Sequence, residues 1–263
     1  MNSVSKLLAG RWVTIVVALV FFSLWEVVSR WGVVSPVLLS SPLRIGRALP
    51  SLLSQGSLIE DLGFSSRVFG ASLALATVVG TLVGLAMGRS PLAYRVLSPF
   101  IISVNALPKI VLMPLIVLWL GIGFGANLFL GTLMASFPVV VSTYSGVRSL
   151  DRELLLVARA FHAGRWMTLR SVILPGILPH LLGGLRVGVN YAMVGVLVSE
   201  FFASSRGVGY RMMLYMSNFE IDAFFVCLVL VAAFSLLCSG VLHWLSLRFQ
   251  AWRPDAFAPA ARP

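Results

Sequence analysis

Six long apolar runs dominate this sequence and limit what it can fold into. They cover residues 13–28, 68–87, 96–120, 126–147, 181–202 and 223–247. A helix of about 20 residues, rising about 1.5 Å per residue, crosses the roughly 30 Å hydrocarbon core of a bilayer. Only 11% of the residues are charged, whereas soluble domains carry about 25%. The sequence therefore predicts an all-α membrane protein with about six transmembrane helices.

The first run follows Lys6 and Arg11, as the apolar part of a cleaved signal peptide would. No small-residue cleavage site follows it, and Glu26 and Trp31 occupy the region where cleavage would occur. We therefore expect an uncleaved first span.

The distribution of Lys and Arg predicts the orientation of the chain. With the N-terminus inside, twelve of these residues fall in cytoplasmic segments and six in outer segments. Cytoplasmic loops of membrane proteins carry an excess of Lys and Arg. We therefore expect both termini in the cytoplasm, with residues 35–62 and 203–222 outside. The same bias accounts for the net charge of +11 without a nucleic-acid partner.

Two further segments carry packing signals. Residues 35–62 form an amphipathic stretch broken by Pro36, Pro42 and Pro50, which we expect along the outer interface. The second run contains small residues at four-residue spacing, Gly80, Gly84 and Gly88. Such residues let another helix approach closely. The spacing leaves open whether that helix belongs to the same bundle or to a second copy.

The segment 151–179, between the fourth and fifth runs, carries helical signals of its own. Asp151 can cap a helix in which Leu154, Val157, Ala158 and Phe161 share one face. Gly164 can end that helix, and residues 165–173 can form a second short helix that ends at Pro175 and Pro179. The pattern favours equally a helix resting on lipid headgroups and a helix that docks on a protein partner.

Several polar side chains lie within the runs, and ionisable residues in a membrane indicate a transport pathway. The third run also contains Pro99, Pro108 and Pro114, which free backbone carbonyls. The alternative is that Arg186 and Glu200 reach the membrane surface from near the ends of their helix. The candidate pathway residues are Asn105, Lys109, Arg186, Asn190, Tyr191 and Glu200.

The sequence lacks the patterns that common catalytic and metal sites require. The three histidines, His162, His180 and His243, have no metal-ligand spacing, and no HExxH motif is present. No phosphate-binding GxxxxGK[ST] motif is present either. We therefore expect no catalytic residue, metal or cofactor in this chain.

The segment 151–179 resembles the EAA loop of binding-protein-dependent ABC importer permeases, whose pattern is E-A-A-x-x-x-G, nine residues, then I-x-L-P. The E-A-A positions fall on Leu156, Val157 and Ala158, and the glycine position falls on His162. The I-x-L-P positions fall on residues 172–175, ending in Leu174 and Pro175. The stretches 107–125, 137–155, 174–202 and 206–210 are similar to the sulfonate, taurine and nitrate branch of that family, and the similarity spans residues 64–252.

The resemblance implies a type I importer core in the bacterial inner membrane. It implies a second permease copy, two cytoplasmic ATPase subunits that bind ATP and Mg²⁺, and an external substrate-binding protein. It also implies that the loop is a coupling helix that docks on the ATPase. The coupling residues would be Arg152, Leu156, Val157, Ala158, Phe161, His162, Gly164, Leu174 and Pro175.

We expect a single permease domain over residues 1–263. It would comprise the first span and outer segment (1–66), the importer core (67–250) and a disordered cytoplasmic tail (251–263). The expected cargo is a sulfonate or similar small anion, with nitrate or a pyrimidine-like solute as alternatives. A secondary transporter or channel without an ATPase is the competing class, although no inverted repeat supports it.

Overall fold

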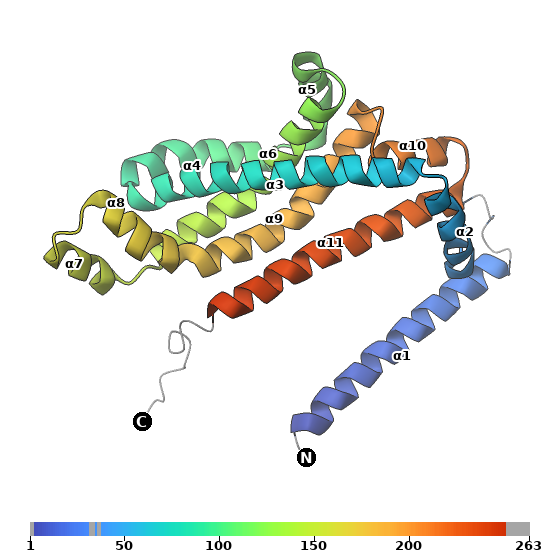
Figure 1. Cartoon of the computed structure of the whole chain (residues 1–263), viewed down its shortest axis with the longest axis horizontal. Helices are drawn as coiled ribbons and strands as arrows, with labels where there is room; N and C mark the ends of the chain where they lie inside the picture. Colours follow the sequence, from blue (N-terminus) through green and yellow to red (C-terminus); the bar gives the residue numbers. More distant parts are fainter. Residues whose placement is uncertain (1–2, 32–34, 36–37, 251–263) are drawn as a thin grey trace.

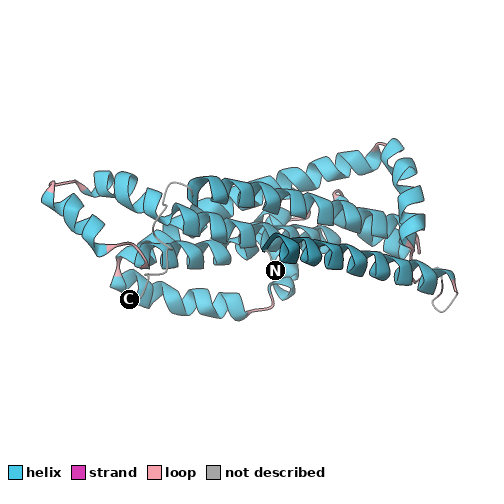
Figure 2. Ribbon diagram, turned by 90° about the horizontal axis from the view of Figure 1, so that it is seen from below, coloured by secondary structure: helices cyan, strands magenta, loops and turns pink. Residues whose placement is uncertain are grey.

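The computed structural model describes residues 3–31, 35 and 38–250, and they form helices joined by short turns. Figure 2 shows helices throughout and no strand among these residues. The elements, labelled in Figure 1, are α1 (Ser3–Arg30), α2 (Pro42–Ser54), α3 (Ser57–Arg89), α4 (Pro91–Ala106), α5 (Met113–Leu120), α6 (Phe124–Arg148), α7 (Arg152–Ala160), α8 (Arg165–Thr168), α9 (Leu174–Ala203), α10 (Val208–Ser217) and α11 (Ile221–Gln250). The predicted tail 251–263 and Pro36 lie outside the described residues.

The predicted membrane-spanning segments are present as long apolar helices. Five helices are long and apolar enough to cross a membrane: Trp12–Arg30, Ser57–Arg89, Phe124–Arg148, Arg165–Ala203 and Ile221–Arg248. A helix pair, Pro91–Ala106 and Lys109–Leu120, is also apolar enough and makes a sixth span if the pair, bent by 90°, crosses as one. The all-α fold with five or six spans is therefore confirmed.

The third run does not form the single helix that its hydropathy predicted. Leu107 takes the extended conformation, with φ −68° and ψ 136°, and α4 ends there. Pro108 explains the break, because its ring disfavours a helical residue before it and it has no N–H to donate. Pro99 lies inside α4 and Pro114 lies in the first turn of α5, so neither of them ends a helix.

Helices α3, α6 and α9 form the core of the bundle, and glycines bring them close together. A Cβ atom on Gly84 would lie 2.6 Å from Thr143 Cβ and 2.8 Å from the carbonyl oxygen of Val140. Gly80 and Gly88 meet Val139 and Val147 in the same way. The glycine stripe of α3 therefore packs on α6 inside this chain, which decides between the two alternatives that its spacing left open.

The two ends of the bundle carry different short helices, and Figure 1 shows α7 and α8 at one end and α2 and α10 at the other. We call them the α7 end and the α10 end. The amphipathic segment before α3 is confirmed, with Ile45 and Leu52 buried. The predicted break at Pro42 coincides with the start of α2, whereas the predicted break at Pro50 was wrong. Pro42 lies in the first turn of α2, where a missing N–H is harmless, and Pro50 lies inside the helix.

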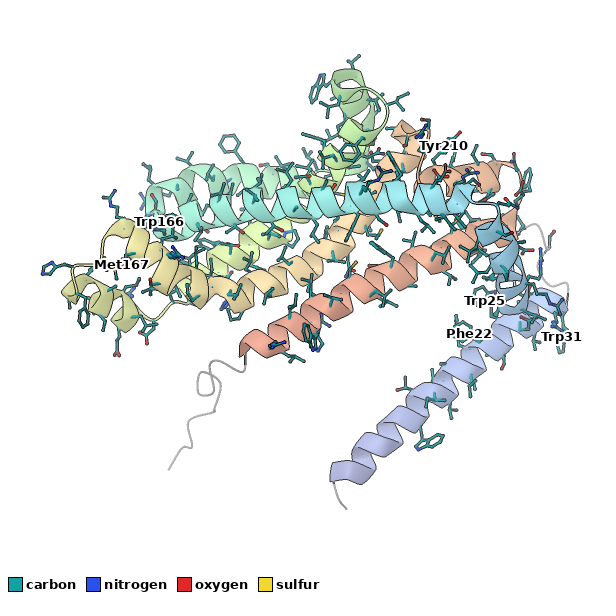
Figure 3. All side chains as sticks on the ribbon, viewed as in Figure 1. Phe22, Trp25, Trp31, Trp166, Met167 and Tyr210 are labelled. Carbon is teal, nitrogen blue, oxygen red and sulfur yellow. The ribbon has the colours of Figure 1, made fainter. Side chains whose placement is uncertain are left out.

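Helix α1 joins the rest of the molecule near its C-terminal end. The Trp25 indole donates a hydrogen bond to the Ser40 carbonyl (2.8 Å), and its ring contacts Phe225. A Glu26 carboxylate oxygen accepts from the Leu43 N–H (3.1 Å) at the start of α2. Figure 3 shows Phe22, Trp25 and Trp31 gathered where α1 approaches α2.

The close approach of α3 to α6 predicts that Gly84→Ala destabilises the bundle. The added methyl group meets backbone as well as side-chain atoms, so the helices must separate, at a cost of about 1–3 kcal/mol. Gly183→Ala is the matched control, because a Cβ there meets nothing within 4 Å. Thermal unfolding of the purified protein should show a lower Tm for Gly84→Ala only. Equal Tm values would contradict this account of the interface.

Candidate functional site

The segment between α6 and α9 begins with the predicted cap. An Asp151 carboxylate oxygen accepts a hydrogen bond from the Glu153 N–H (2.9 Å), which satisfies one free donor at the start of α7. Residues 152–160 then form the predicted helix. Local sequence signals were sufficient here because capping and helix formation involve residues within one or two turns.

The turn after α7 lies at His162 and not at Gly164. His162 has a φ of 51°, in the left-handed region, while Gly164 has a φ of −62°. The His162 N–H donates to the Arg159 carbonyl and the Ala163 N–H donates to the Ala158 carbonyl. This is the hydrogen-bond pattern in which a glycine usually occupies the position of His162. The residue aligned with the EAA-loop glycine therefore keeps its backbone role despite its side chain.

The second short helix does not stop at the prolines. α8, a π-helical turn (Leu169–Ile173) and α9 follow one another without a break over Arg165–Ala203. Pro175 lies in the first turn of α9, next to Leu174, and Pro179 lies inside it. The prediction that Pro175 and Pro179 end a helix was wrong, because both prolines lie within the continuous helical segment Arg165–Ala203. A π-helical turn, Leu169–Ile173, lies in the ladder directly before Pro175, and such local adjustments let a helix continue through a proline.

The α7–α8 segment exposes a large apolar surface at the end of the molecule. Phe161 is 81% exposed and Trp166 is 71% exposed, and Figure 3 shows Trp166 and Met167 at this end. Ala158 is buried, so it packs within the chain and is not part of the exposed face. The α7–α8 surface consists of Leu154, Leu156, Val157, Phe161, Trp166 and Met167. Four exposed arginines surround it: Arg152, Arg159, Arg165 and Arg170.

Lys109 and Asn105 lie together at the break between α4 and α5. The Lys109 ammonium donates to the Asn105 backbone oxygen (3.0 Å) and approaches its side-chain oxygen (3.4 Å). It also lies 4.7 Å from the centre of the Phe137 ring on α6. Beside the break, a groove of about 620 Å³ is lined by residues of the α5 region and by Phe202. Two of the six predicted pathway residues therefore meet where a spanning helix is interrupted.

The other four predicted pathway residues all lie on α9, and two of them bond to α11. An Arg186 guanidinium nitrogen lies 3.2 Å from His243 Nδ1, and the Ser235 hydroxyl donates to the Asn190 side chain (3.2 Å). Tyr191 is 44% exposed. In the part of the chain that is described, no hydrogen bond or ion pair joins these residues to Lys109 or Asn105.

Glu200, the sixth predicted pathway residue, is fully buried near the α10 end. Its carboxylate accepts hydrogen bonds from the Ser65 hydroxyl (2.7 Å) and from the Gly209 N–H (2.8 Å). Ser65 in turn accepts from the Val208 N–H (2.8 Å). The role of Glu200 in a pathway stays a prediction, and its side chain is enclosed within this chain.

Asp61 completes this group, and sequence reasoning did not single it out. Its carboxylate accepts from the Gly207 N–H (2.8 Å) and pairs with the Arg211 guanidinium. This pairing raises the pKa of Arg211 above its ordinary value. We call Asp61, Ser65 and Glu200, with the N–H groups of residues 207–209, the α10 clasp. The sequence signal that could have indicated this group is the pair of glycines at 207 and 209. A Cβ at either position would overlap Glu200.

Among the described residues, no three His, Cys, Asp or Glu side chains are arranged to hold a metal ion. The prominent features are instead an exposed apolar surface continuous with a spanning helix and an interrupted span that carries a cation.

Comparison with known proteins agrees with this geometry. Residues 76–251 match the family "Binding-protein-dependent transport system inner membrane component". The putative aliphatic sulfonates transport permease protein SsuC of Bacillus subtilis is 29% identical over 89% of this chain and 85% of its own length. The taurine transport system permease protein TauC of Escherichia coli is 29% identical over 90% of this chain and 88% of its own length.

A third relative and a solved structure extend the comparison. The formylaminopyrimidine transport permease protein ThiX of Halalkalibacterium halodurans is 27% identical over 89% of this chain and 93% of its own length. An inward-facing MetNI methionine ABC transporter structure has a TM-score of 0.68 at 16% identity, covering 74% of this chain and 97% of the other. That likeness supports the type I importer fold.

The family match covers residues 76–251, and the relatives described above match 89–90% of the chain. Proteins of this family work with a separate ATPase, which hydrolyses ATP, and with a substrate-binding protein. The chain belongs to the family of binding-protein-dependent transport system inner membrane components, as a multi-pass permease subunit of an ABC importer.

Proposed function

We propose that two copies of this permease form the membrane pathway for a small organic sulfonate, and that the α7–α8 surface docks on the ATPase. The observation that carries the docking proposal is the exposed apolar α7–α8 surface, which is continuous with the spanning helix α9. A solvent-exposed Phe161 and Trp166 are unfavourable unless a partner covers them.

The continuity of α8 with α9 supports a coupling role for this surface. A rigid helix of 39 residues, Arg165–Ala203, connects the docking end of the molecule with the α10 end. Movement of the ATPase at Phe161 and Trp166 would therefore be transmitted into the spans, because a packed helix moves as a unit. If the segment only rested on lipid headgroups, the continuity of α8 with α9 would have no role.

Docking on an ATPase sets the proposed orientation. The ATPase binds cytoplasmic ATP, so the α7 end faces the cytoplasm and the α10 end faces outward. Helix α11 runs from the α10 end back across the membrane, which places the C-terminus inside. Helix α1 joins α2 at the α10 end, which places the N-terminus inside as well. The proposed location is the bacterial inner membrane, in agreement with the Lys and Arg distribution.

The exposed break between α4 and α5 supports a second copy of the chain. Asn105, Leu107 and Pro108 are exposed in the single chain, and the break lies within a membrane-spanning pair. Lipid cannot satisfy the free backbone groups of a broken helix, so such a break must face protein or a water-filled cavity. In a symmetric dimer that encloses the two breaks, each break would face the second protein copy and a water-filled cavity between the copies.

The proposed cargo rests on the relatives and on Lys109. Two of the relatives described above carry aliphatic sulfonates or taurine in their names. Lys109 places a positive charge at the break, where a cation lowers the barrier for an anion that enters a low-dielectric path. The relative named for formylaminopyrimidine makes a pyrimidine-like solute the second candidate.

The docking proposal predicts that Phe161→Ala weakens ATPase binding. Exposed aromatic anchors at interfaces contribute about 2 kcal/mol or more, which corresponds to roughly 30-fold in affinity. Phe219→Ala is the control, since Phe219 is a phenylalanine that is 68% exposed at the opposite, α10 end. Co-purification of ATPase subunits with each variant is the measurement. Loss in both variants, or in neither, would count against docking at this surface.

The dimer proposal predicts two permease copies in each assembly. Native mass spectrometry of the complex extracted with its ATPase should give a mass that contains two permease chains and two ATPase chains. A mass that contains one permease chain would refute the proposal.

The pathway proposal predicts that Lys109→Glu slows sulfonate uptake far more than Lys109→Gln does. The first substitution reverses the charge at the break, and the second only removes it. Arg30→Gln is the control, because Arg30 pairs with Glu26 on α1 and is not a candidate pathway residue, and it should leave uptake nearly unchanged. The measurement is uptake of radiolabelled taurine into proteoliposomes with intact complexes. Normal uptake by Lys109→Glu would remove Lys109 from the path.

A further inference from the structure

A polar cavity of about 830 Å³ opens at the α10 end, separate from the groove beside the α4–α5 break. It lies between the start of α3 and the connection from α9 to α10. Figure 3 shows Tyr210, one of its lining residues, where that connection meets α10. The lining residues used below are Glu60, Asp61, Arg67, Ser205, Arg206 and Arg211.

The wall of this cavity is held in place by the α10 clasp. The connection 204–207 is fixed at its end by the bond from the Gly207 N–H to Asp61. Within it, the Ser204 hydroxyl donates to the Arg206 carbonyl (2.6 Å). At its start, the Ala203 carbonyl accepts from the Gly123 N–H (2.7 Å). Arg206 is therefore presented from a short connection with both ends anchored.

Two guanidinium groups of the cavity remain available for a ligand. Arg211 is committed to Asp61, and that pair is electrically neutral. The Arg67 Nε donates to the Gly63 carbonyl (3.2 Å), which leaves its terminal nitrogens unassigned. In the described part of the chain, neither Arg67 nor Arg206 forms an ion pair. Glu60 is the one uncompensated carboxylate among the lining residues, so the cavity has a small positive balance.

The position of the cavity suits a solute that arrives from outside. Arg67 and Arg89 are 22 positions apart on α3, which is about 33 Å along a helix and close to the hydrocarbon thickness. Arg67 therefore lies at the outer membrane surface when Arg89 lies at the inner one. Phe202, just before the connection 204–207, lines the groove beside the break. The groove and the cavity are thus lined by neighbouring residues of one stretch, Phe202 for the groove and Ser205 and Arg206 for the cavity.

We propose that this cavity is a reception site in which Arg67 and Arg206 bind a small organic sulfonate before it reaches the α4–α5 break. The proposal rests on the orientation and cargo proposed above. Planar guanidinium groups donate paired hydrogen bonds to the oxygens of such anions. Glu60 keeps the site weak, so that it concentrates the anion and releases it.

The test uses a cysteine at Ser205 in full-length permease lacking Cys227 and Cys238, held in nanodiscs of neutral phosphatidylcholine. Two thiol reagents of similar size are compared, a sulfonatoethyl and a trimethylammonioethyl methanethiosulfonate. The anionic reagent should react faster by about tenfold once rates are normalised to a small free thiol. Sodium ethanesulfonate should slow this reaction, whereas choline chloride at equal ionic strength should not.

Three variants outside the clasp sharpen the test. Arg67→Gln and Arg206→Gln should each reduce the preference for the anionic reagent and the protection by ethanesulfonate. Glu60→Gln should increase both the preference for the anionic reagent and the protection by ethanesulfonate. This change is opposite in sign to that of the arginine variants, and destabilisation of the protein would not produce it. Unchanged Tm values should accompany all three, because none of these side chains belongs to the α10 clasp.

Equal rates for the two reagents would overturn the reception site, and so would a preference that ethanesulfonate and choline chloride reduce equally. Neither result would affect ATPase docking at Phe161, which is measured separately by co-purification. Protection by ethanesulfonate together with failure of sulfonate uptake would instead contradict the proposed cargo.

Discussion

The α10 end of this permease depends on one set of hydrogen bonds: the backbone N–H groups of residues 207–209 donate to oxygens of Asp61, Ser65 and Glu200. A carboxylate buried as fully as that of Glu200 is unfavourable unless hydrogen bonds replace its water. The start of α10 supplies those donors, and helix N-termini favour negative charge. Hydrogen bonds to charged groups contribute about 1.5–3 kcal/mol each. The clasp therefore joins α3, α9 and α10, and it positions the connection that carries Arg206.

Helix α9 links the α10 end with the α7–α8 surface, where we propose that the ATPase docks. Its glycines allow close contact with α6, where a Cβ on Gly195 would lie 2.9 Å from Gly131 Cα. Close packing gives the α3–α6–α9 core few ways to deform. The α4–α5 pair is the opposite, with a 90° break and an exposed polar turn. In the proposed arrangement, movement of the ATPase would therefore move the core as a unit, and the α4–α5 pair would form part of the pathway wall.

Local sequence signals predicted the parts that depend on near neighbours. The number of spans, the Asp151 cap and helix α7 were all predicted correctly, because hydropathy and capping act within a few turns. Local rules failed for the prolines. Pro108 breaks a span that hydropathy joined, whereas Pro50 and Pro179 remain inside helices. Tertiary contacts decide whether the loss of one backbone hydrogen bond ends a helix.

The sequence by itself determined that this chain crosses a membrane several times and presents a helical loop between its fourth and fifth runs, because segment length and apolar content suffice for both. Only the tertiary structure decided which groups meet. Gly84 contacts Val140 and Thr143 on another helix, and Asp61 meets Arg211 across 150 positions. It also showed that His162 keeps the glycine conformation and that Glu200 is buried. These outcomes depend on long-range packing, because a local sequence pattern does not indicate which distant N–H group will donate to a given carboxylate.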